Sequence, residues 1–143
     1  MAETGRRIIF YDQLGCGRSS IPESKPETWT VELYVDELNV VRRALGLDRI
    51  HLLGQSWGGM LAMEFALTQP PGLESLTIAS SPASMILWVE EENRLRQDLP
   101  PDAQQTLLRH EAAGTFDSPE YKAAMAVFYV RHVCRVDPRP DYV

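Results

Sequence analysis

A strand, a sharp turn and a helix are encoded together in Ile50-His51-Leu52-Leu53-Gly54-Gln55-Ser56-Trp57-Gly58-Gly59-Met60. The first four residues form a short, mostly apolar run, which is typical of a strand buried in a parallel sheet. After the glycines the sequence stays apolar on most sides as far as Gln69, as a helix packed closely on a sheet should be. The turn between them contains the pattern G-x-S-x-G.

This strand–turn–helix context is the one that a nucleophile elbow requires. Ser56 would lie at the top of the turn, with its hydroxyl above the sheet edge and at the positive end of the helix. We expect Gly54 and Gly58 to be glycines because Cβ atoms there would collide with the neighbouring chain. The alternative is a glycine-rich turn without chemistry. The flanking strand and helix, and a second glycine-rich turn upstream, favour Ser56 as a nucleophile.

The composition is that of a globular protein of ordinary domain size, with 143 residues of which 44% are hydrophobic and 24% charged. A net charge of −6 argues against partners such as nucleic acid or an anionic membrane. The longest apolar run, 85–89, is too short to span a bilayer. The first seven residues lack the apolar core of a secretory signal, so we expect a cytoplasmic location. Cys16 and Cys134 are too few for a disulfide framework or a zinc site.

The remaining segments of the first half predict an α/β arrangement. Apolar runs at 8–11 and 76–79 indicate two further strands, and a helix is expected from an N-cap at Thr30 to a terminating Gly46. Strands that alternate with helices in this order give a parallel sheet with helical crossovers. The helix should bury one stripe and expose one charged side. The stripe is Tyr34, Leu38, Val41 and Leu45, and the charged side is Asp36, Glu37, Arg42 and Arg43.

The second half predicts helices with no strand between them. One helix is expected over 85–99, one from an Asp102 cap to Gly114, and one from Ser118, with Pro119 at its first position, to about Val133. Such a series indicates a helical layer over a sheet rather than another crossover. The residues that follow form a loop.

Two other kinds of site are possible in this sequence. Gly15-x-Gly17 begins like a dinucleotide fingerprint, but Ser20 stands at the third glycine, and Pro22 and Pro26 leave no room for the helix that should receive a pyrophosphate. Cys16 is more simply a small loop residue than a reactive thiol.

The three histidines are weak candidates for a catalytic base. We expect His51 to be packed or hydrogen-bonded against a covering helix. It precedes Ser56 by five residues on the same strand, so its ring cannot easily reach the serine hydroxyl. His110 and His132 lie among arginines on the later helices and are predicted to be solvated.

Serine hydrolysis needs a nucleophile, a base, an acid that orients the base, and donors for an oxyanion. Ser56 supplies the first, and the backbone N–H of Trp57 would supply one oxyanion donor. The acid and the histidine normally follow on loops after later strands, and the other donor comes from a loop upstream of Ile8. None of these is found here, so we expect the chain to be a piece of a longer fold that lacks both ends.

Two motifs together resemble the proline iminopeptidase family of α/β-hydrolases, including its amino-acid amidase relatives. They are Asp12-Gln13-x-Gly15-x-Gly17-Arg18-Ser19 and Gly54-Gln55-Ser56-Trp57-Gly58-Gly59, and segments 116–121 and 128–135 look like the same family. Leu14 stands where the family usually has arginine. The resemblance implies a partial α/β-hydrolase core at 1–83, a partial parallel sheet with flanking helices, and the start of a helical cap at 84–143.

By this resemblance, the protein would release N-terminal residues, preferably proline, from small peptides or amides through an acyl-enzyme on Ser56. Trp57 would supply an oxyanion N–H, and no metal or cofactor is implied. The family's His-Gly-Gly-Pro loop, catalytic Asp and His, and amine-binding cap glutamates match no residue here, and neither Glu111 nor Glu120 is assigned to replace them. The alternatives are an amino-acid amidase or esterase of the same fold, or a non-catalytic binding module whose open sheet edges would cause dimers or aggregates. The oligomeric state itself is not predicted.

Overall fold

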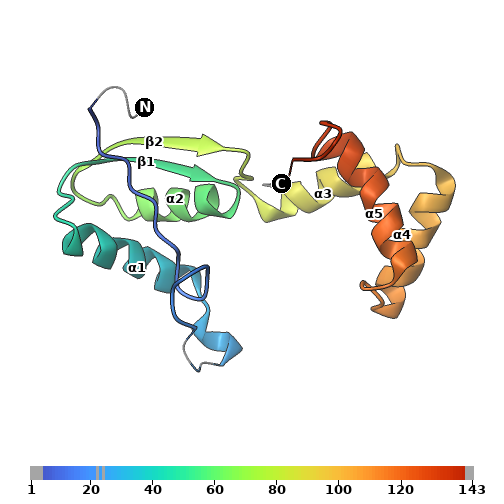
Figure 1. Cartoon of the computed structure of the whole chain (residues 1–143), viewed down its shortest axis with the longest axis horizontal. Coiled ribbons are helices and arrows are strands. Elements are labelled where there is room, and N and C mark those ends of the chain that lie inside the picture. Colours follow the sequence, from blue (N-terminus) through green and yellow to red (C-terminus); the bar gives the residue numbers. More distant parts are fainter. Residues whose placement is uncertain (1–4, 22, 24, 141–143) are drawn as a thin grey trace. The chain divides into compact units, whose positions relative to one another are not determined.

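The computed structural model describes residues 5–21, 23 and 25–140, so expectations for the first four residues, for Pro22 and for 141–143 lie outside it. The chain divides into two units, 1–83 and 84–143, each of which is described by itself (Figure 1).

A parallel strand pair forms the centre of the first unit. Strands β1 (Ile50–Gln55) and β2 (Leu73–Ala79) pair so that Leu52 lies opposite Leu76 and Gln55 opposite Ala79. Helix α2 (Trp57–Leu67) connects the strands and lies against one face of the pair (Figure 1). Its side chains Leu61, Ala62 and Phe65 are buried there. This confirms the predicted strand–helix–strand unit, with both strands longer than the apolar runs.

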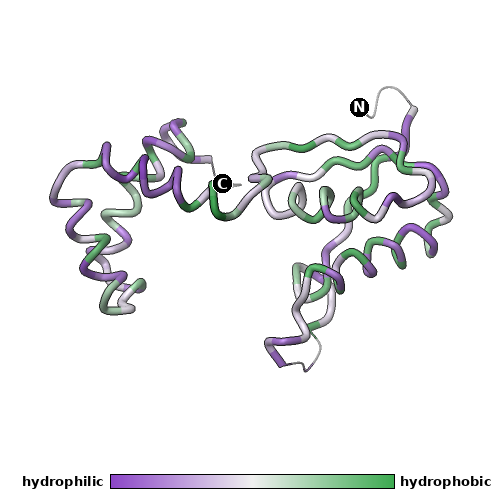
Figure 2. The backbone as a smooth tube through the Cα atoms, turned by 180° about the vertical axis from the view of Figure 1, so that it is seen from behind, coloured by the Kyte–Doolittle hydropathy of each residue, from purple (hydrophilic) through white to green (hydrophobic). Residues whose placement is uncertain are grey.

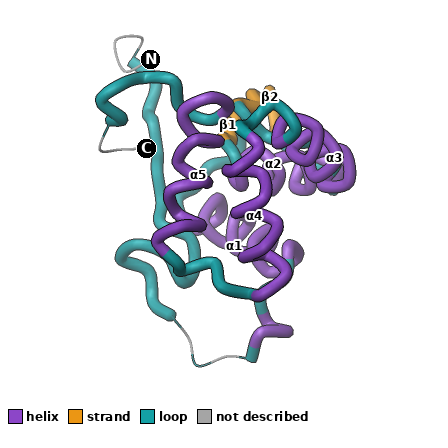
Figure 3. The backbone as a smooth tube through the Cα atoms, turned by 90° about the vertical axis from the view of Figure 1, so that its right-hand side faces the viewer, coloured by secondary structure: helices purple, strands orange, loops and turns teal. Residues whose placement is uncertain are grey.

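The strand predicted at 8–11 is wrong. These residues belong to no strand or helix, and Figure 3 shows the N-terminal segment as loop. Phe10 is 91% exposed. A strand is stable only when its backbone groups pair with a neighbour, and in the described part of the chain β1 and β2 pair only with each other. The apolar pattern alone therefore did not produce a strand here.

Helix α1 (Val31–Ala44) packs against α2 and has the predicted ends (Figure 1). The Thr30 hydroxyl accepts a hydrogen bond from the Leu33 N–H, and Gly46 adopts φ +61° after the last turn. The N–H groups of Gly46 and Leu47 return to the carbonyls of Arg43 and Arg42, the bonding pattern of a Schellman motif. A short 3₁₀ turn, η2 (Pro26–Thr28), precedes the helix.

The two sides of α1 are less distinct than the sequence predicts. Leu38 is buried, whereas Leu45, at the end of the expected stripe, is 46% exposed. Arg42, expected in solvent, is buried: its guanidinium donates to the Pro71 carbonyl at 2.8 Å and lies over the Phe65 ring at 5.5 Å. Arginine can be buried in this way because its long stem packs on apolar surface while its head finds carbonyl acceptors.

The face of the strand pair away from α2 is uncovered by any described element of the first unit. His51 and Leu53, which alternate onto that face, are both exposed, and Leu53 is apolar. Figure 2 shows hydrophobic stretches along the strand pair. The helix expected over His51 is therefore absent from this part of the structure. Instead, His51 Nδ1 lies 2.8 Å from Ser75 Oγ on β2.

The second unit contains helices α3 (Met85–Arg96), α4 (Pro101–Ala113) and α5 (Pro119–His132) and no strand among its described residues (Figure 3). Ser118 caps α5 through the Tyr121 N–H, as predicted, and Gly114 ends α4 at φ +65°. Helix α4 begins at Pro101, so Asp102 lies in its first turn rather than at its cap. The unit has its own core, formed by Leu99, Ala103, Leu107, Ala124 and Phe128. No helix in the described ranges is long and apolar enough to cross a membrane.

A half-buried ionic cluster joins the helices of this unit. The Arg96 guanidinium donates to Glu111 at 2.7 Å and to Glu92 at 2.8 Å, and the Tyr121 hydroxyl donates to Glu111. Burial, followed by the Glu111 carboxylate, raises the pKa of Tyr121. Glu111 therefore acts as a structural partner of Arg96.

Candidate active site

Ser56 lies between the end of β1 and the start of α2, with φ +55° and ψ −124°. This conformation is strained for a residue with a Cβ and persists only when the surroundings hold it. The Ser56 N–H donates to the Ala79 carbonyl at 3.0 Å, and the Ser56 carbonyl accepts from the N–H groups of Gly59 at 2.9 Å and Met60 at 3.3 Å. The β2 terminus and the first turn of α2 thus fix Ser56, whose side chain remains exposed.

The glycines of the turn differ in their roles. An ideal Cβ on Gly54 would overlap the Gly58 carbonyl, so the absence of a side chain at Gly54 is required, as predicted. A Cβ on Gly58 would meet nothing within 4 Å, which contradicts the prediction for that residue. The second tight position is Gly59, where a Cβ would overlap Ser81 Oγ. The sequence shows the Gly58-Gly59 pair but not which of the two faces the neighbouring loop.

Trp57 is the first residue of α2, and its backbone N–H is one of those that a helix start leaves without an intrahelical acceptor. Among the described residues, no atom accepts a hydrogen bond from this N–H. The partial positive charge of the helix terminus lies at the same place, directly after Ser56. A negatively charged oxygen formed beside Ser56 would therefore find both a donor and a favourable field.

The Trp57 ring connects the two motifs that are far apart in the sequence. Its Nε1–H donates to Gln13 Oε1 at 3.1 Å, and its ring meets Tyr34 edge-on at 5.8 Å between centroids. Sequence reasoning quoted Gln13 and Trp57 in separate motifs and did not predict their contact.

The turn that contains Gln13 is closed by hydrogen bonds that Asp12 accepts from residues at the other end of the turn. Asp12 Oδ2 accepts from the Arg18 backbone N–H at 3.1 Å, and the Asp12 carbonyl accepts from the Ser19 hydroxyl at 2.6 Å. The backbone N–H of Arg18, and then its guanidinium, hold the pKa of Asp12 below its usual value. Gly17, at φ +52°, has no room for a Cβ beside this carboxylate. Gly17 thus makes the turn's closure possible.

Two bonds tie the same turn to α1 at Leu14. The Leu14 N–H donates to Glu37 Oε1 at 2.7 Å, and the Leu14 carbonyl accepts from the Tyr34 hydroxyl at 3.3 Å. Glu37, expected in solvent, is therefore partly buried beneath the turn. Burial, followed by the charge of Glu37, raises the pKa of Tyr11. The family that this chain resembles usually has arginine at the position of Leu14. Here the Leu14 backbone, rather than a side-chain ion pair, connects the turn to α1.

None of the hydrogen bonds of the three histidines goes to Ser56. His110 is bonded to Thr115 Oγ1 at 2.7 Å and to Ser118, and His132 is half-buried with its ring 5.0 Å from that of Phe128. Both were expected to be solvated, and both are instead packed within their unit. The described residues contain no group of acidic, histidine or cysteine side chains arranged to hold a metal ion.

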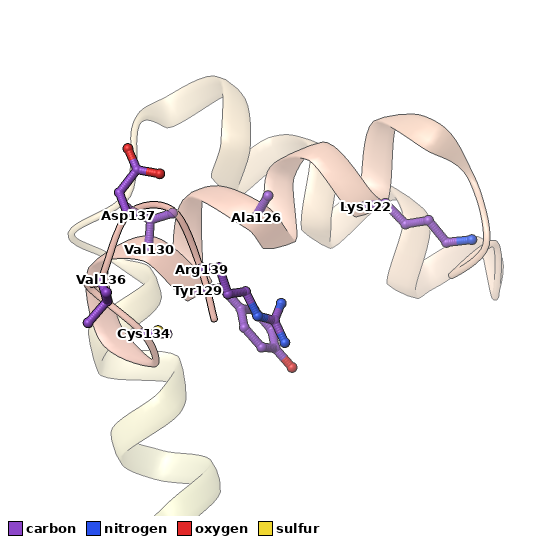
Figure 4. Close-up of a pocket in the computed structure, with 8 residues that line it drawn as sticks. All are labelled: Lys122, Ala126, Tyr129, Val130, Cys134, Val136, Asp137 and Arg139. Atoms are coloured by element: carbon purple, nitrogen blue, oxygen red, sulfur yellow. The ribbon is translucent and has the colours of Figure 1, made fainter. Parts of the chain in front are cut away.

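A pocket of about 370 Å³ lies in the second unit, between α5 and the segment after it (Figure 4). In the lining of this pocket, the Arg139 guanidinium carbon lies over the Tyr129 ring, 5.4 Å from the ring centroid. Its lining contains no residue of the two motifs, so it is not the site that the serine defines.

The family model of the alpha/beta hydrolase fold matches residues 1–141. The chain belongs to this family. The α/β-hydrolase fold predicted from the sequence is thereby confirmed.

Curated relatives make the resemblance more specific. A proline iminopeptidase of Lactobacillus delbrueckii subsp. lactis is 49% identical over 138 residues, which are 95% of this chain and 47% of that protein. A proline iminopeptidase of Clostridium botulinum is 44% identical over 142 residues, which are 99% of this chain and 48% of that protein. The resemblance to proline iminopeptidases is confirmed, and the chain spans about half the length of the curated relatives it matches.

Two solved structures are also similar to this chain over most of its length. The crystal structure of VinJ superimposes with a TM-score of 0.92 at 50% identity, over 98% of this chain and 48% of that one. The proline iminopeptidase of Mycobacterium smegmatis gives a TM-score of 0.81 at 55% identity, over 91% of this chain and 44% of that one.

Proposed function

We propose that the protein acts as a serine hydrolase that releases N-terminal residues, preferentially proline, from small peptides or amides. The observation that carries this proposal is the strained Ser56 at the β1–α2 junction, followed at once by the unpaired Trp57 N–H. The relatives named proline iminopeptidases support the substrate class. In this view 1–83 is part of the hydrolase core, 84–143 begins its cap, and the protein works in the cytoplasm.

The chemistry assigns two roles to this chain. Ser56 Oγ attacks the carbonyl carbon of the N-terminal residue, and the oxyanion of the tetrahedral intermediate accepts a hydrogen bond from the Trp57 N–H. The base returns the serine proton to the departing nitrogen, so that collapse of the intermediate expels a neutral amine and leaves the acyl group on Ser56. Water then hydrolyses the acyl-enzyme and frees the Ser56 hydroxyl. The base that takes the serine proton and the acid that orients this base are assigned to no residue of this chain.

The test is Ser56→Ala in the protein at its natural length, established by intact mass from its source. We expect turnover of a prolyl arylamide to fall by at least about 10⁴-fold, with unchanged circular dichroism and melting temperature. Ser75→Ala is the matched control, because Ser75 is an exposed β2 serine that also makes a side-chain hydrogen bond. Full turnover in Ser56→Ala would remove the nucleophile assignment.

Substrate choice is tested separately on the unmodified protein. Rates on prolyl arylamides, leucyl arylamides and acyl esters are compared. A preference for the prolyl compound supports the proposed specificity, whereas faster turnover of another amide or of an ester would indicate an amidase or an esterase of the same fold.

A further inference from the structure

The carbonyl of Ala79, at the end of β2, receives two hydrogen bonds. One comes from the Ser56 N–H at 3.0 Å, and the other comes from the Ser81 hydroxyl at 3.0 Å. The parallel register places Gln55 opposite Ala79, so the residues that follow both strands leave the sheet side by side. The carbonyl that holds the backbone of Ser56 is thus itself held by Ser81.

Ser81 also contacts the elbow from a second direction. It is half-buried, and its Oγ occupies the space that a side chain on Gly59 would fill. Gly59 in turn donates its N–H to the Ser56 carbonyl. The single hydroxyl of Ser81 therefore touches both supports of Ser56, the Ala79 carbonyl on one side and the first turn of α2 on the other.

Ser80, which lies between Ala79 and Ser81, also has a strained backbone conformation. Ser80 has φ +49°, in the left-handed region, which only a few per cent of non-glycine residues adopt. Strained backbone of this kind persists where neighbouring contacts over-determine it, and it gathers at functional sites. Here the strain turns the chain sharply after β2 and brings Ser81 back over the end of the strand that it has just left.

We propose that Ser81 is a positioning residue for the nucleophile: it fixes the Ala79 carbonyl and the Gly59 backbone, and through them the strained conformation of Ser56. This inference rests on the proposed function of Ser56. Because Ser81 acts through the serine backbone, its loss should slow the chemical step and leave substrate binding nearly unchanged.

The first experiment measures catalysis in Ser81→Ala in the protein at its natural length. Alanine keeps the Cβ but removes the hydroxyl that bonds to Ala79. We expect kcat on a prolyl arylamide to fall about tenfold, which is the effect of losing one net hydrogen bond, while KM stays within about twofold. The control is again Ser75→Ala, for which both constants should match the unmodified protein.

The second experiment tests the contact without using catalysis. Gly59→Ala should lower the melting temperature because its new methyl group overlaps Ser81 Oγ. Ser81→Gly removes that obstacle, so the double variant Gly59→Ala/Ser81→Gly should melt higher than Gly59→Ala alone. The remaining close neighbour, the Gly54 carbonyl at 3.1 Å from the ideal Cβ, needs only a small shift.

The outcomes separate this inference from the proposed function. Loss of kcat in Ser81→Ala together with recovery in the double variant supports the positioning role. An inactive Ser56→Ala beside a fully active Ser81→Ala overturns the positioning role and leaves the nucleophile in place. A double variant that melts no higher than Gly59→Ala overturns the contact. Full turnover in Ser56→Ala removes the proposed function and the role of Ser81 with it.

Discussion

Ser56 adopts a backbone conformation that costs a non-glycine residue about 1–3 kcal/mol. The surrounding contacts must supply that energy, and the closest of them depend on the absence of side chains at particular glycines. A Cβ on Gly54 would overlap the Gly58 carbonyl, and a Cβ on Gly59 would overlap Ser81 Oγ. Adding a single methyl group therefore destabilises the turn at some of its glycines and not at their neighbours.

Gly54 and Gly58 provide a matched pair of alanine substitutions. Gly54→Ala places a methyl group into the Gly58 carbonyl and should destabilise the protein by about 3 kcal/mol or more. Gly58→Ala meets open space within the first turn of α2, where alanine favours the helix, and should change stability by about 1 kcal/mol at most. Urea unfolding measures both. Equal losses in the two variants would contradict the described packing of the turn.

The serine and its immediate context were predictable because G-x-S-x-G combines residue types with a fixed spacing. The difference between Gly58 and Gly59 was not, because it depends on which of the two Cα atoms faces Ser81 in the loop after β2. Arg42 illustrates the same limit. Its charge predicts solvent exposure, whereas the Pro71 carbonyl that accepts its hydrogen bond is 29 residues away in sequence.

The elements around the site are joined by side chains that act between segments. The Asp12–Ser19 turn reaches α1 through Glu37 and Tyr34, and it reaches the start of α2 through Gln13. Trp57 lies where these connections meet, because its ring contacts both Gln13 and Tyr34. The turn, α1 and α2 therefore support one another at the elbow.

A double-mutant cycle measures the connection between the turn and α2. Gln13→Leu removes the acceptor, and Trp57→Phe removes the indole N–H while keeping an aromatic ring against Tyr34. Each single variant should lose about 1 kcal/mol of stability. The double variant should lose less than the sum, with a coupling of about 0.5–1 kcal/mol from denaturant unfolding. Strict additivity would show that this hydrogen bond contributes nothing to stability.

Helix boundaries were more predictable than strands. Thr30, Gly46, Ser118 and Gly114 mark helix ends through local backbone bonds that the nearby sequence specifies. The run at 8–11 has a strand-like composition, but a strand also requires a partner from elsewhere in the chain. The local sequence therefore specifies where a helix ends, but it does not specify whether a strand finds a partner.

The chain as a whole buries two separate sets of apolar side chains. Phe65, which is fully buried, belongs to α2 in the first unit, and Leu107, at 1% exposure, belongs to the core of the second. The order of strands and helices predicted the α/β class. It also predicted a change of character after Ala83, where strands give way to helices. The membership of the second core followed only from the structure, since it depends on how α4 and α5 pack together.

Separate cores imply that the two units open independently. Leu107→Ala leaves a cavity between α4 and α5 and should lower the stability of that unit by about 2–5 kcal/mol. Phe65→Ala should lower that of the first unit by about 3–5 kcal/mol. Peptide-resolved hydrogen exchange distinguishes them: Leu107→Ala should speed exchange in α4 and α5 but not in β1 and α2, and Phe65→Ala should do the reverse. If either substitution accelerates exchange equally throughout the chain, the two units unfold in a single cooperative step and the expectation of independent opening is wrong.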